Sequence, residues 1–402
     1  MIEQKKPIVQ FTCNLGNICT FDFVKSLNVL ALSSWYPSDT DPFLGNFVRR
    51  HCEAISTLHN VWVIFVADVD KKSKERIEKT KSGNLTEIII YQVARRNSIA
   101  KFFLKRKTML GMVEDLGIDF DIIHAHAIFP LAPIFSFLSK KLDIPWVFSE
   151  HWSGFHEEFR PTINSLKWKW VMNAAKTAKM GFPVSENLAA AVGNVFTNLE
   201  LRCVPNVVED VFFESIQTRQ RNSQVQFLHV STLDEKYKNM RGTLEAFSKL
   251  KNAGYDFHFL IVSDGDFSGA KKWITEFDLA DRVELKGPLS PKQIANEMAF
   301  SDALVLFSNT ENQPCVVLES LSLGLPVIAS MVGDIPNLVS HDKGFLMPAG
   351  NVEALHESLT KFIENRSNFS RTEVAKGTRE RFSKEAIARM YSDAYTEILG
   401  RE

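Results

Sequence analysis

Cysteine is scarce in this sequence and follows no recognisable pattern. The five cysteines, at positions 13, 19, 52, 203 and 315 of 402 residues, lack the close pairing of a zinc site. Their odd number and wide spacing also argue against a disulfide framework. We therefore expect a protein of a reduced, cytoplasmic compartment without a zinc site.

Long apolar runs are absent too, although 45% of the residues are hydrophobic. The nearest approach, residues 122–138, contains His124, His126 and two prolines and falls short of the about 18 residues that span a bilayer. A buried strand leading into a helix explains this run better. Near the N-terminus polar residues interrupt any signal-like core, so we expect residues 1–26 to be a loose extension.

The chain as a whole lacks an excess of charge of either sign. Its net charge is −1, but residues 1–205 carry +5 and residues 206–402 carry −6. The near-neutral whole argues against a nucleic-acid partner. The first half is the side that we expect to meet an anionic surface.

Apolar runs of strand length alternate with longer segments of helical pattern along most of the chain. This alternation is typical of α/β domains with parallel sheets, and the length predicts two or three domains. The runs that we expect to be strands include residues 27–33, 61–67, 88–91, 121–126, 225–231, 257–262 and 303–307.

One stretch, residues 308–326, organises the second half. Apolar runs of strand length stand on both sides of it, Pro314 suits the first turn of a helix, and Gly324 suits its end. The stretch therefore predicts a strand, a tight loop, a short helix and a second strand. The loop would lie at the carboxyl edge of the sheet, where open α/β folds bind ligands.

Two glutamates flank this expected ligand-binding point. Glu319 lies inside the predicted helix, where a carboxylate can accept two hydrogen bonds from a vicinal diol such as a ribose. Glu311 lies in the loop before it, nearer whatever is joined to a diphosphate. The unpaired N–H groups and the dipole at the helix start suit phosphate oxygens.

This pair, followed by Gly-Leu-Pro-Val, resembles the Glu-x7-Glu signature of the family 4 (group 1) glycosyltransferases. The resemblance implies an α/β protein of GT-B fold, with two doubly wound, Rossmann-like parallel-sheet domains facing a central cleft. It extends over about residues 27–400 as an ordered set of motifs. The family's usual Glu-Gly-Phe-Gly opening is replaced here by Glu-Asn-Gln-Pro at residues 311–314.

The resemblance also implies domain boundaries. The segment 201–210 resembles the one that leaves the first domain in the family, so we expect an acceptor-side domain at residues 1–205 and a donor domain at 206–385. The C-terminal helix, residues 386–402, should return to the first domain.

Site residues follow from the same resemblance, position by position. His126, in the stretch Asp-Ile-Ile-His-Ala-His, would hydrogen-bond the transferring sugar, and Glu311 would hold its hydroxyls. Lys238, with Lys236 as a close rival, would contact the diphosphate, while Thr232 stands where the family has an arginine. The other expected donor-binding residues are Gly45, Gly287, Leu289, Asn312, Gln313, Pro314, Cys315 and Glu319.

The implied function is transfer of a sugar from a nucleoside diphosphate donor to a polysaccharide or lipid-linked acceptor, with retention at the anomeric carbon. It implies neither a cofactor nor a metal ion. Two alternatives stay open on sequence alone. One is a nucleotide-sugar epimerase or hydrolase of the same architecture, and the other is a non-catalytic membrane- or glycan-binding relative.

Two basic segments with interleaved aromatic residues lie in the first half, at residues 95–107 and 166–171. Either could rest on an anionic bilayer through its cations and apolar side chains. An amphipathic surface helix with extended lysines explains them equally well. An anionic membrane surface is therefore an expected partner, at the inner face of the membrane.

Overall fold

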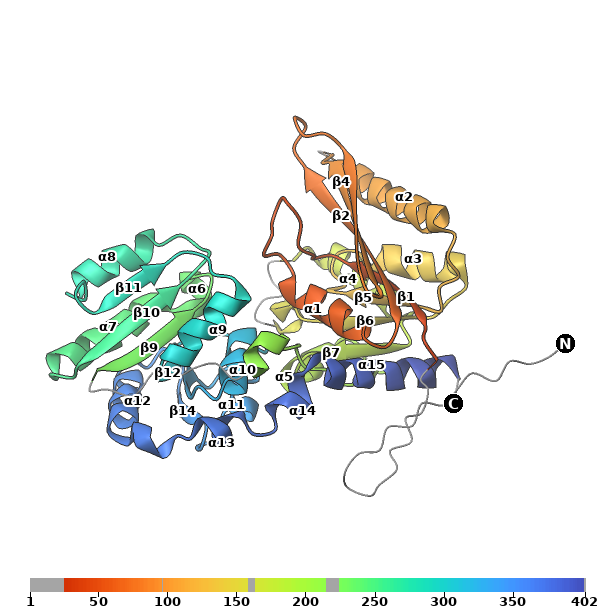
Figure 1. The fold of residues 1–402 in the computed structure, drawn as a ribbon. Helices are drawn as coiled ribbons and strands as arrows, with labels where there is room; N and C mark the ends of the chain where they lie inside the picture. Colours follow the sequence, from red (N-terminus) through yellow and green to blue (C-terminus); the bar gives the residue numbers. More distant parts are fainter. Residues whose placement is uncertain (1–24, 96, 158–162, 215–223, 401–402) are drawn as a thin grey trace, which may run out of the picture.

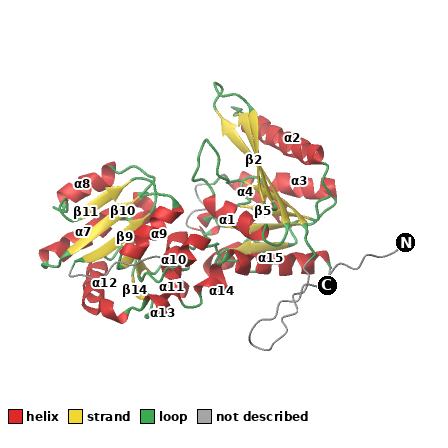
Figure 2. Ribbon diagram, in the orientation of Figure 1, coloured by secondary structure: helices red, strands yellow, loops and turns green. Residues whose placement is uncertain are grey.

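The computed structural model describes residues 25–95, 97–157, 163–214 and 224–400, which form two α/β domains (Figure 1). Of the expected loose extension, residues 1–24 lie outside the described part. Helices flank both sheets, as the colouring by secondary structure shows (Figure 2). The predicted α/β class is confirmed, and both sheets are mostly parallel.

The first domain contains an eight-stranded sheet in the order β3-β4-β2-β1-β5-β6-β7-β8. All neighbouring pairs are parallel except β3 and β4. Its strands are β1 (Asn28–Ser33), β2 (Asn60–Val69), β3 (Arg76–Ser82), β4 (Leu85–Val93), β5 (Ile122–His126), β6 (Trp146–Glu150), β7 (Met180–Pro183) and β8 (Glu200–Leu201). Its helices are α1 (Asn46–Ile55), α2 (Ser98–Leu116), α3 (Ala132–Leu142), α4 (Ser165–Ala175) and α5 (Glu186–Gly193).

The second domain contains a six-stranded parallel sheet in the order β11-β10-β9-β12-β13-β14. Its strands are β9 (Val225–Val230), β10 (Phe257–Val262), β11 (Val283–Lys286), β12 (Ala303–Leu306), β13 (Val327–Ser330) and β14 (Gly344–Met347). Its helices are α6 (Glu235–Lys238), α7 (Met240–Asn252), α8 (Ser268–Glu276), α9 (Pro291–Phe300), α10 (Cys315–Ser322), α11 (Ile335–Leu338), α12 (Val352–Asn365), α13 (Arg371–Ala375) and α14 (Thr378–Phe382).

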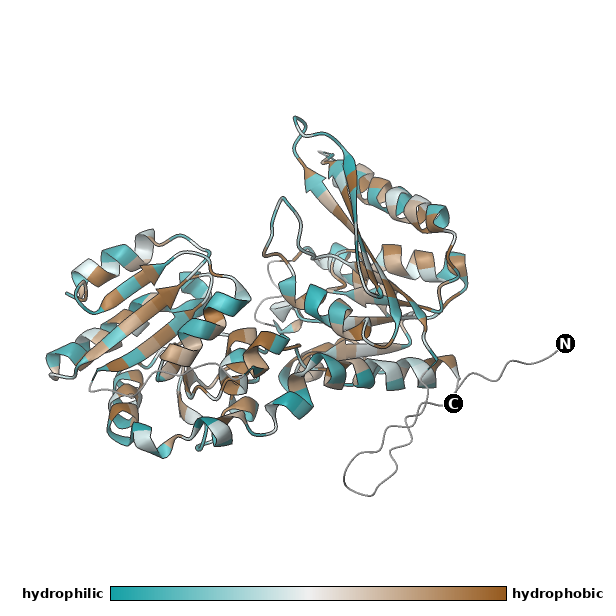
Figure 3. Cartoon of the chain, viewed as in Figure 1, coloured by the Kyte–Doolittle hydropathy of each residue, from teal (hydrophilic) through white to brown (hydrophobic). Residues whose placement is uncertain are grey.

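The first sheet is covered by apolar packing on both faces. Leu30 and Leu32 of β1 belong to one hydrophobic core, and Val29 and Ala31 belong to the other, because successive side chains of a strand point to opposite faces. Burial on both faces explains why these strands read as continuous apolar runs. The same character marks the strands of the second sheet (Figure 3).

The last helix, α15 (Lys384–Leu399), crosses from the second domain and packs along the first. Figure 1 shows it below β7, on the first domain and away from the second sheet. Ile387, Tyr391, Ala394 and Tyr395 are fully buried in the core that also contains α1. The expected boundary at 205/206 falls between β8 and β9, the strands where the first sheet ends and the second begins. Among the described residues, no helix is long and apolar enough to cross a bilayer.

Candidate active site

The predicted strand–loop–helix–strand unit is present in the second domain. It consists of β12, the loop 307–314, α10 and the parallel strand β13. Pro314 is the N-cap of α10, and no side chain caps its first N–H groups. The start of this helix is therefore open to accept an anion.

Glu311 lies within that loop, beside Lys238 from the segment that follows the neighbouring strand β9. Its Oε1 atom is 2.5 Å from Nζ of Lys238 and 2.7 Å from the hydroxyl of Ser308. Both charged side chains are mostly buried, with 18% of Lys238 and 10% of Glu311 exposed. Lys238 thus carries its charge to the start of α10.

Lys236, the rival lysine, lies on the same short helix α6 but contacts a different side chain. Lys236 is exposed, and its ammonium group sits 5.1 Å from the ring of Tyr237, on its own short helix. Lys238 is therefore the lysine that the fold directs to Glu311. Thr232 is exposed on the same strand exit, Gly287 is exposed after β11, and Leu289 packs partly against the core of the domain.

Glu319 is 6% exposed and forms an ion pair across the two domains. Nη1 of Arg50, from α1, is 2.6 Å from Oε1 of Glu319, and its Nη2 is 2.7 Å from Glu209 in the connection between domains. Burial alone would lower the pKa of Arg50, but Glu319 and the other anionic neighbours raise it above its ordinary value. The charged pair is therefore retained although it is buried.

The two amides of the loop bind protein groups of the first domain and the connection. The Asn312 amide donates to the carbonyl of His151 over 2.7 Å and its oxygen lies 3.2 Å from Nε2 of His156. The Gln313 oxygen accepts from the backbone N–H of Asn206 over 2.7 Å. Both side chains, which we expected to bind the donor, instead hold the two domains together in this structure.

A second loop, after β13, fixes the first one from below. Gly333 has φ +57°, and a Cβ atom there would lie 2.2 Å from the carbonyl oxygen of Glu311. The next residue, Asp334, accepts a 2.7 Å hydrogen bond from the side chain of Gln313 and donates its N–H to Asn312 over 2.8 Å. Glycine at 333 is thus required for the close approach of these two loops.

Gly45 has a comparable local role in the first domain. It precedes α1 with φ +69°, and an added Cβ would lie 2.7 Å from the carbonyl carbon of Trp35. The close approach that this glycine permits is to the backbone of residues 35–36. The sequence predicted a position that needs glycine, and Gly45 has the positive φ that glycine favours. The group that it approaches in this structure is backbone of the same protein.

His126 is fully buried among other histidines. Its ring stacks on that of His124 at 4.3 Å and lies 6.1 Å from that of His151, and its Nε2 is 3.9 Å from the Cys52 sulfur. Its Nδ1 has no hydrogen-bond partner in the described structure. Nδ1 is therefore the atom through which His126 would meet a sugar hydroxyl.

A chain of buried hydrogen bonds starts in α15 and passes beside this histidine. The Tyr395 hydroxyl is 2.5 Å from Nδ1 of His124, whose Nε2 is 2.8 Å from Ser149. Ser149 in turn is 2.8 Å from the hydroxyl of Tyr391, which is 2.9 Å from Nδ1 of His51. The chain joins the C-terminal helix to α1 through the middle of the first sheet.

The same chain continues into the second domain. Nε2 of His51 is 3.3 Å from Asn206, and the Asn206 amide donates to the carbonyl of Gln313 over 2.9 Å. Gln313 then donates to Asp334 as described above. Neutral imidazoles suit such a chain because each provides one donor and one acceptor.

Burial keeps these imidazoles neutral. Burial lowers the pKa of His124, His126 and His151 well below the ordinary value, assisted by neighbouring histidines. It lowers the pKa of His51 to about 4, and it has the same effect on His229, which lies in β9 of the second domain. Burial also raises the pKa of Glu150 to about 7 against three backbone N–H donors. The buried surroundings of His126 thus disfavour charged groups.

We expect Gly333→Ala to misplace the loop that carries Glu311. A matched control is Gly83→Ala, because Gly83 also has positive φ (+56°) but nothing within 4 Å of an added Cβ. The control should cost about 1–2 kcal/mol of unfolding free energy for the left-handed backbone alone. Gly333→Ala should cost more and should also weaken nucleotide binding, measured by urea unfolding and calorimetry. Equal losses in the two variants would contradict the steric explanation.

We expect stability to fall on mild acidification. Below pH 6.5 the unfolded chain protonates its histidines while the buried rings stay neutral until about pH 4, so the unfolded state binds more protons. Each such histidine contributes up to ~1.4 kcal/mol per pH unit, and Glu150, with its raised pKa, opposes one of them. The urea midpoint should therefore drop between pH 7 and 5.5. A constant or rising midpoint would contradict the assignment.

Comparison with known proteins agrees with this geometry. The sequence profile of the Glycosyltransferase Family 4 matches residues 44–211, and that of the Glycosyl transferases group 1 matches residues 211–389. The N-acetyl-alpha-D-glucosaminyl L-malate synthase of Bacillus anthracis is 25% identical over 50% of this chain and 55% of its own length. The amylovoran biosynthesis glycosyltransferase AmsK of Erwinia amylovora is 31% identical over 36% and 37%. The chain therefore spans 55% or less of these two curated relatives.

Among solved structures, HepE of Anabaena in complex with UDP-glucose has the same fold. It superposes with a TM-score of 0.68 over 92% of this chain and 100% of its own, at 15% identity.

Sequence reasoning missed Arg50, His51, Asn206 and Asp334, because nothing in the sequence marks their contacts across the domains. The predicted residues Glu311 and Lys238 lie in contact, and the roles predicted for them and for Glu319 stay predictions. The chain belongs to the group 1 glycosyltransferases of family 4, with the two parallel-sheet domains of the GT-B fold.

Proposed function

We propose that this protein is a retaining glycosyltransferase that uses a nucleoside diphosphate sugar and acts in the synthesis of cell-envelope glycans. The observation that carries the proposal is the arrangement of Lys238, Glu311 and Glu319 around the uncapped start of α10. One cation, one helix N-terminus and two carboxylates match the charges and hydroxyls of such a donor. AmsK, a relative named for amylovoran biosynthesis, supports the envelope setting.

The diphosphate would lie between Lys238 and the start of α10. The ammonium group and the first N–H groups of the helix would stabilise the charge that develops on the leaving phosphate, so the reaction would need neither a metal ion nor a cofactor. Thr232 removes one bidentate clamp that the family has. Lys238 would therefore stabilise more of the negative charge of the diphosphate than a lysine that acts together with an arginine.

The ribose would bind at Glu319. Arg50 occupies Oε1 of that carboxylate, so the diol would take Oε2 or displace Arg50. Displacement would separate a buried ion pair, and Glu209 would retain the guanidinium through its own contact. The site is thus arranged to exchange one buried partner of Glu319 for another.

The sugar would lie between Glu311 and His126. The acceptor hydroxyl would attack the anomeric carbon on the face from which the diphosphate leaves, forming one C–O bond as the other breaks. The leaving phosphate oxygen would take the acceptor proton, so no protein nucleophile is required. Closure of the domains would exclude water from this step.

The nucleobase of the donor would be uracil, by analogy with HepE, whose structure contains UDP-glucose. The acceptor would be a polysaccharide or a lipid-linked glycan. Transfer onto added acceptors separates this proposal from an epimerase or a hydrolase, and binding of a nucleotide sugar separates it from a non-catalytic relative.

The membrane-facing side would be the first domain. Two pairs of exposed apolar residues, each spaced four apart, lie on α2 and α4: Ile99 with Phe103, and Leu166 with Trp170. Lys107 and Lys169 are exposed on the same helices. Phe102 and Trp168, which belong to the two basic segments 95–107 and 166–171, pack partly into the core. The proposed working place is therefore the inner face of an anionic membrane.

Lys238→Ala should weaken binding of UDP by roughly 1.5–3 kcal/mol, the contribution of a hydrogen bond to a charged group. Binding of uridine should hardly change, because it lacks the phosphates. Lys236→Ala is the matched control and should leave both affinities unchanged. Calorimetry of UDP and uridine with the three proteins measures these effects. If Lys236→Ala produces the loss instead, the lysine assignment is wrong.

Exchange of Lys107 and Lys169 for glutamate should release the protein from anionic vesicles. Each cation near an anionic surface contributes about 1 kcal/mol, and salt screens it. The control exchanges the exposed Lys272 and Lys292 of the second domain, which alters the net charge equally. Sedimentation with vesicles measures binding. Equal binding to neutral and anionic vesicles, or equal loss in the control, would end the membrane proposal.

A further inference from the structure

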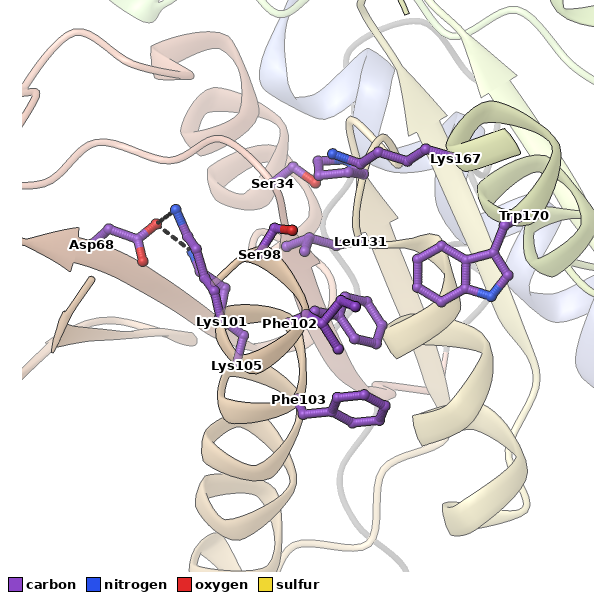
Figure 4. A pocket seen from close by; sticks show the side chains of 12 residues that line it. Ser34, Asp68, Ser98, Lys101, Phe102, Phe103, Lys105, Leu131, Lys167 and Trp170 are labelled. Carbon is purple, nitrogen blue, oxygen red and sulfur yellow. Dashed lines mark ion pairs between the residues drawn. The ribbon is translucent and has the colours of Figure 1, made fainter. Parts of the chain in front are cut away.

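The first domain contains a pocket of about 630 Å³ that no step of the proposed donor chemistry uses. It opens between α2 and α4, close to the carboxyl ends of β1 and β2. Figure 4 shows Phe102 and Phe103 of α2 opposite Trp170 of α4, with Leu131 between the helices. The rings of Phe102 and Trp170 are 4.9 Å apart. This part of the pocket is apolar.

The other part of the pocket is cationic. Lys101 and Lys105 both lie 2.9 Å from the same oxygen of Asp68, and Lys167 extends toward Ser34 on the opposite side (Figure 4). Three lysines against one carboxylate leave a positive charge in the pocket. A ligand with a hydrocarbon part and an anionic part would satisfy both halves.

Partly exposed aromatic side chains lead from the pocket toward His126. Lys167 lies 5.3 Å from the ring of Phe129, which stacks on Trp152 at 5.0 Å, and Trp152 meets Trp35 at 6.4 Å. Trp35 contacts Phe47 at 6.3 Å, and Phe47 lies 4.6 Å from His151, which neighbours His126. Flat apolar ring faces of this kind suit the C–H faces of sugar rings. The wall joins the pocket to the expected place of transfer.

We infer that the pocket binds the lipid phosphate end of the acceptor, whose sugar then lies along this aromatic wall with its hydroxyl toward His126. The inference rests on the proposed function and specifies its acceptor as a lipid-linked one. The hydrocarbon contacts Phe102, Phe103 and Trp170, and the phosphate contacts Lys167 and the lysines beside Asp68. A free glycan would leave the apolar half of the pocket empty.

Dodecyl phosphate, kept below its micelle concentration, is the probe that tests this assignment by calorimetry. It should bind about tenfold or more tightly than dodecanol or inorganic phosphate, since each of these lacks one half of the match. Phe103→Ser and Lys167→Gln should each weaken binding by about tenfold. Equal affinity for dodecanol or for inorganic phosphate would overturn the assignment.

Two control variants are matched to these. Phe300→Ser removes a phenylalanine on the second domain that is as exposed as Phe103, at 50% each, and Lys140→Gln removes an exposed lysine of α3 outside the pocket. Both should bind dodecyl phosphate like the unaltered protein, and losses equal to those of the pocket variants would overturn the assignment. A parallel titration with UDP tests the proposed function separately. If the protein binds UDP but not dodecyl phosphate, the acceptor pocket is wrong and the donor site stands. If it binds dodecyl phosphate but not UDP, the donor site is wrong and the pocket stands.

Discussion

The buried hydrogen-bond chain from Tyr395 to Asp334 is the constraint on which the site depends. It begins in the last helix, crosses the first sheet through His124 and His51, and ends in the loop that fixes Glu311. Each member is buried, so each unmade bond would leave a polar group without water. The chain therefore defines one relative position of the two domains, and the loop of residues 311–314 is held by both of them.

The cross-domain ion pair has a different character. Arg50 and Glu319 are separated by 269 positions in the sequence and meet where the two domains contact each other. A buried pair of this kind contributes little net stability, since desolvation offsets most of the attraction. It does specify geometry, because either partner alone in that place would be an unpaired buried charge. The pair thus fixes the position of the Glu319 carboxylate, whose Oε2 can accept a hydrogen bond from a second partner.

The sequence predicted the elements of the site and their order, because local patterns determine them. Pro314 and Gly324 bound the helix, and the glutamates take their places from the helix and its loop. The resemblance to the family favoured Lys238, with Lys236 as a close rival, and in the structure Lys238 contacts Glu311. Contacts across the domains could not be predicted this way. Gln313 and Asn312 belong to the site loop in sequence, but no local pattern shows that their partners are Asn206 and His151, which are more than 100 positions away.

The two ends of the proposed reaction impose opposite demands on this closed arrangement. His126 is fully buried, so a sugar can reach its Nδ1 only if groups that pack around it move. In the same structure Asn312 is bonded to His151 of the first domain, and Gln313 is bonded to Asn206 in the connection. A donor that binds only to the second domain would have to replace those bonds with its own. Glu319, Lys238 and the start of α10 offer it such contacts on one face. The lipid pocket and the aromatic wall belong wholly to the first domain, so an acceptor can occupy them without disturbing the pairing of the domains. We therefore expect donor binding to require that these bonds open, whereas the acceptor can bind to the first domain without opening them.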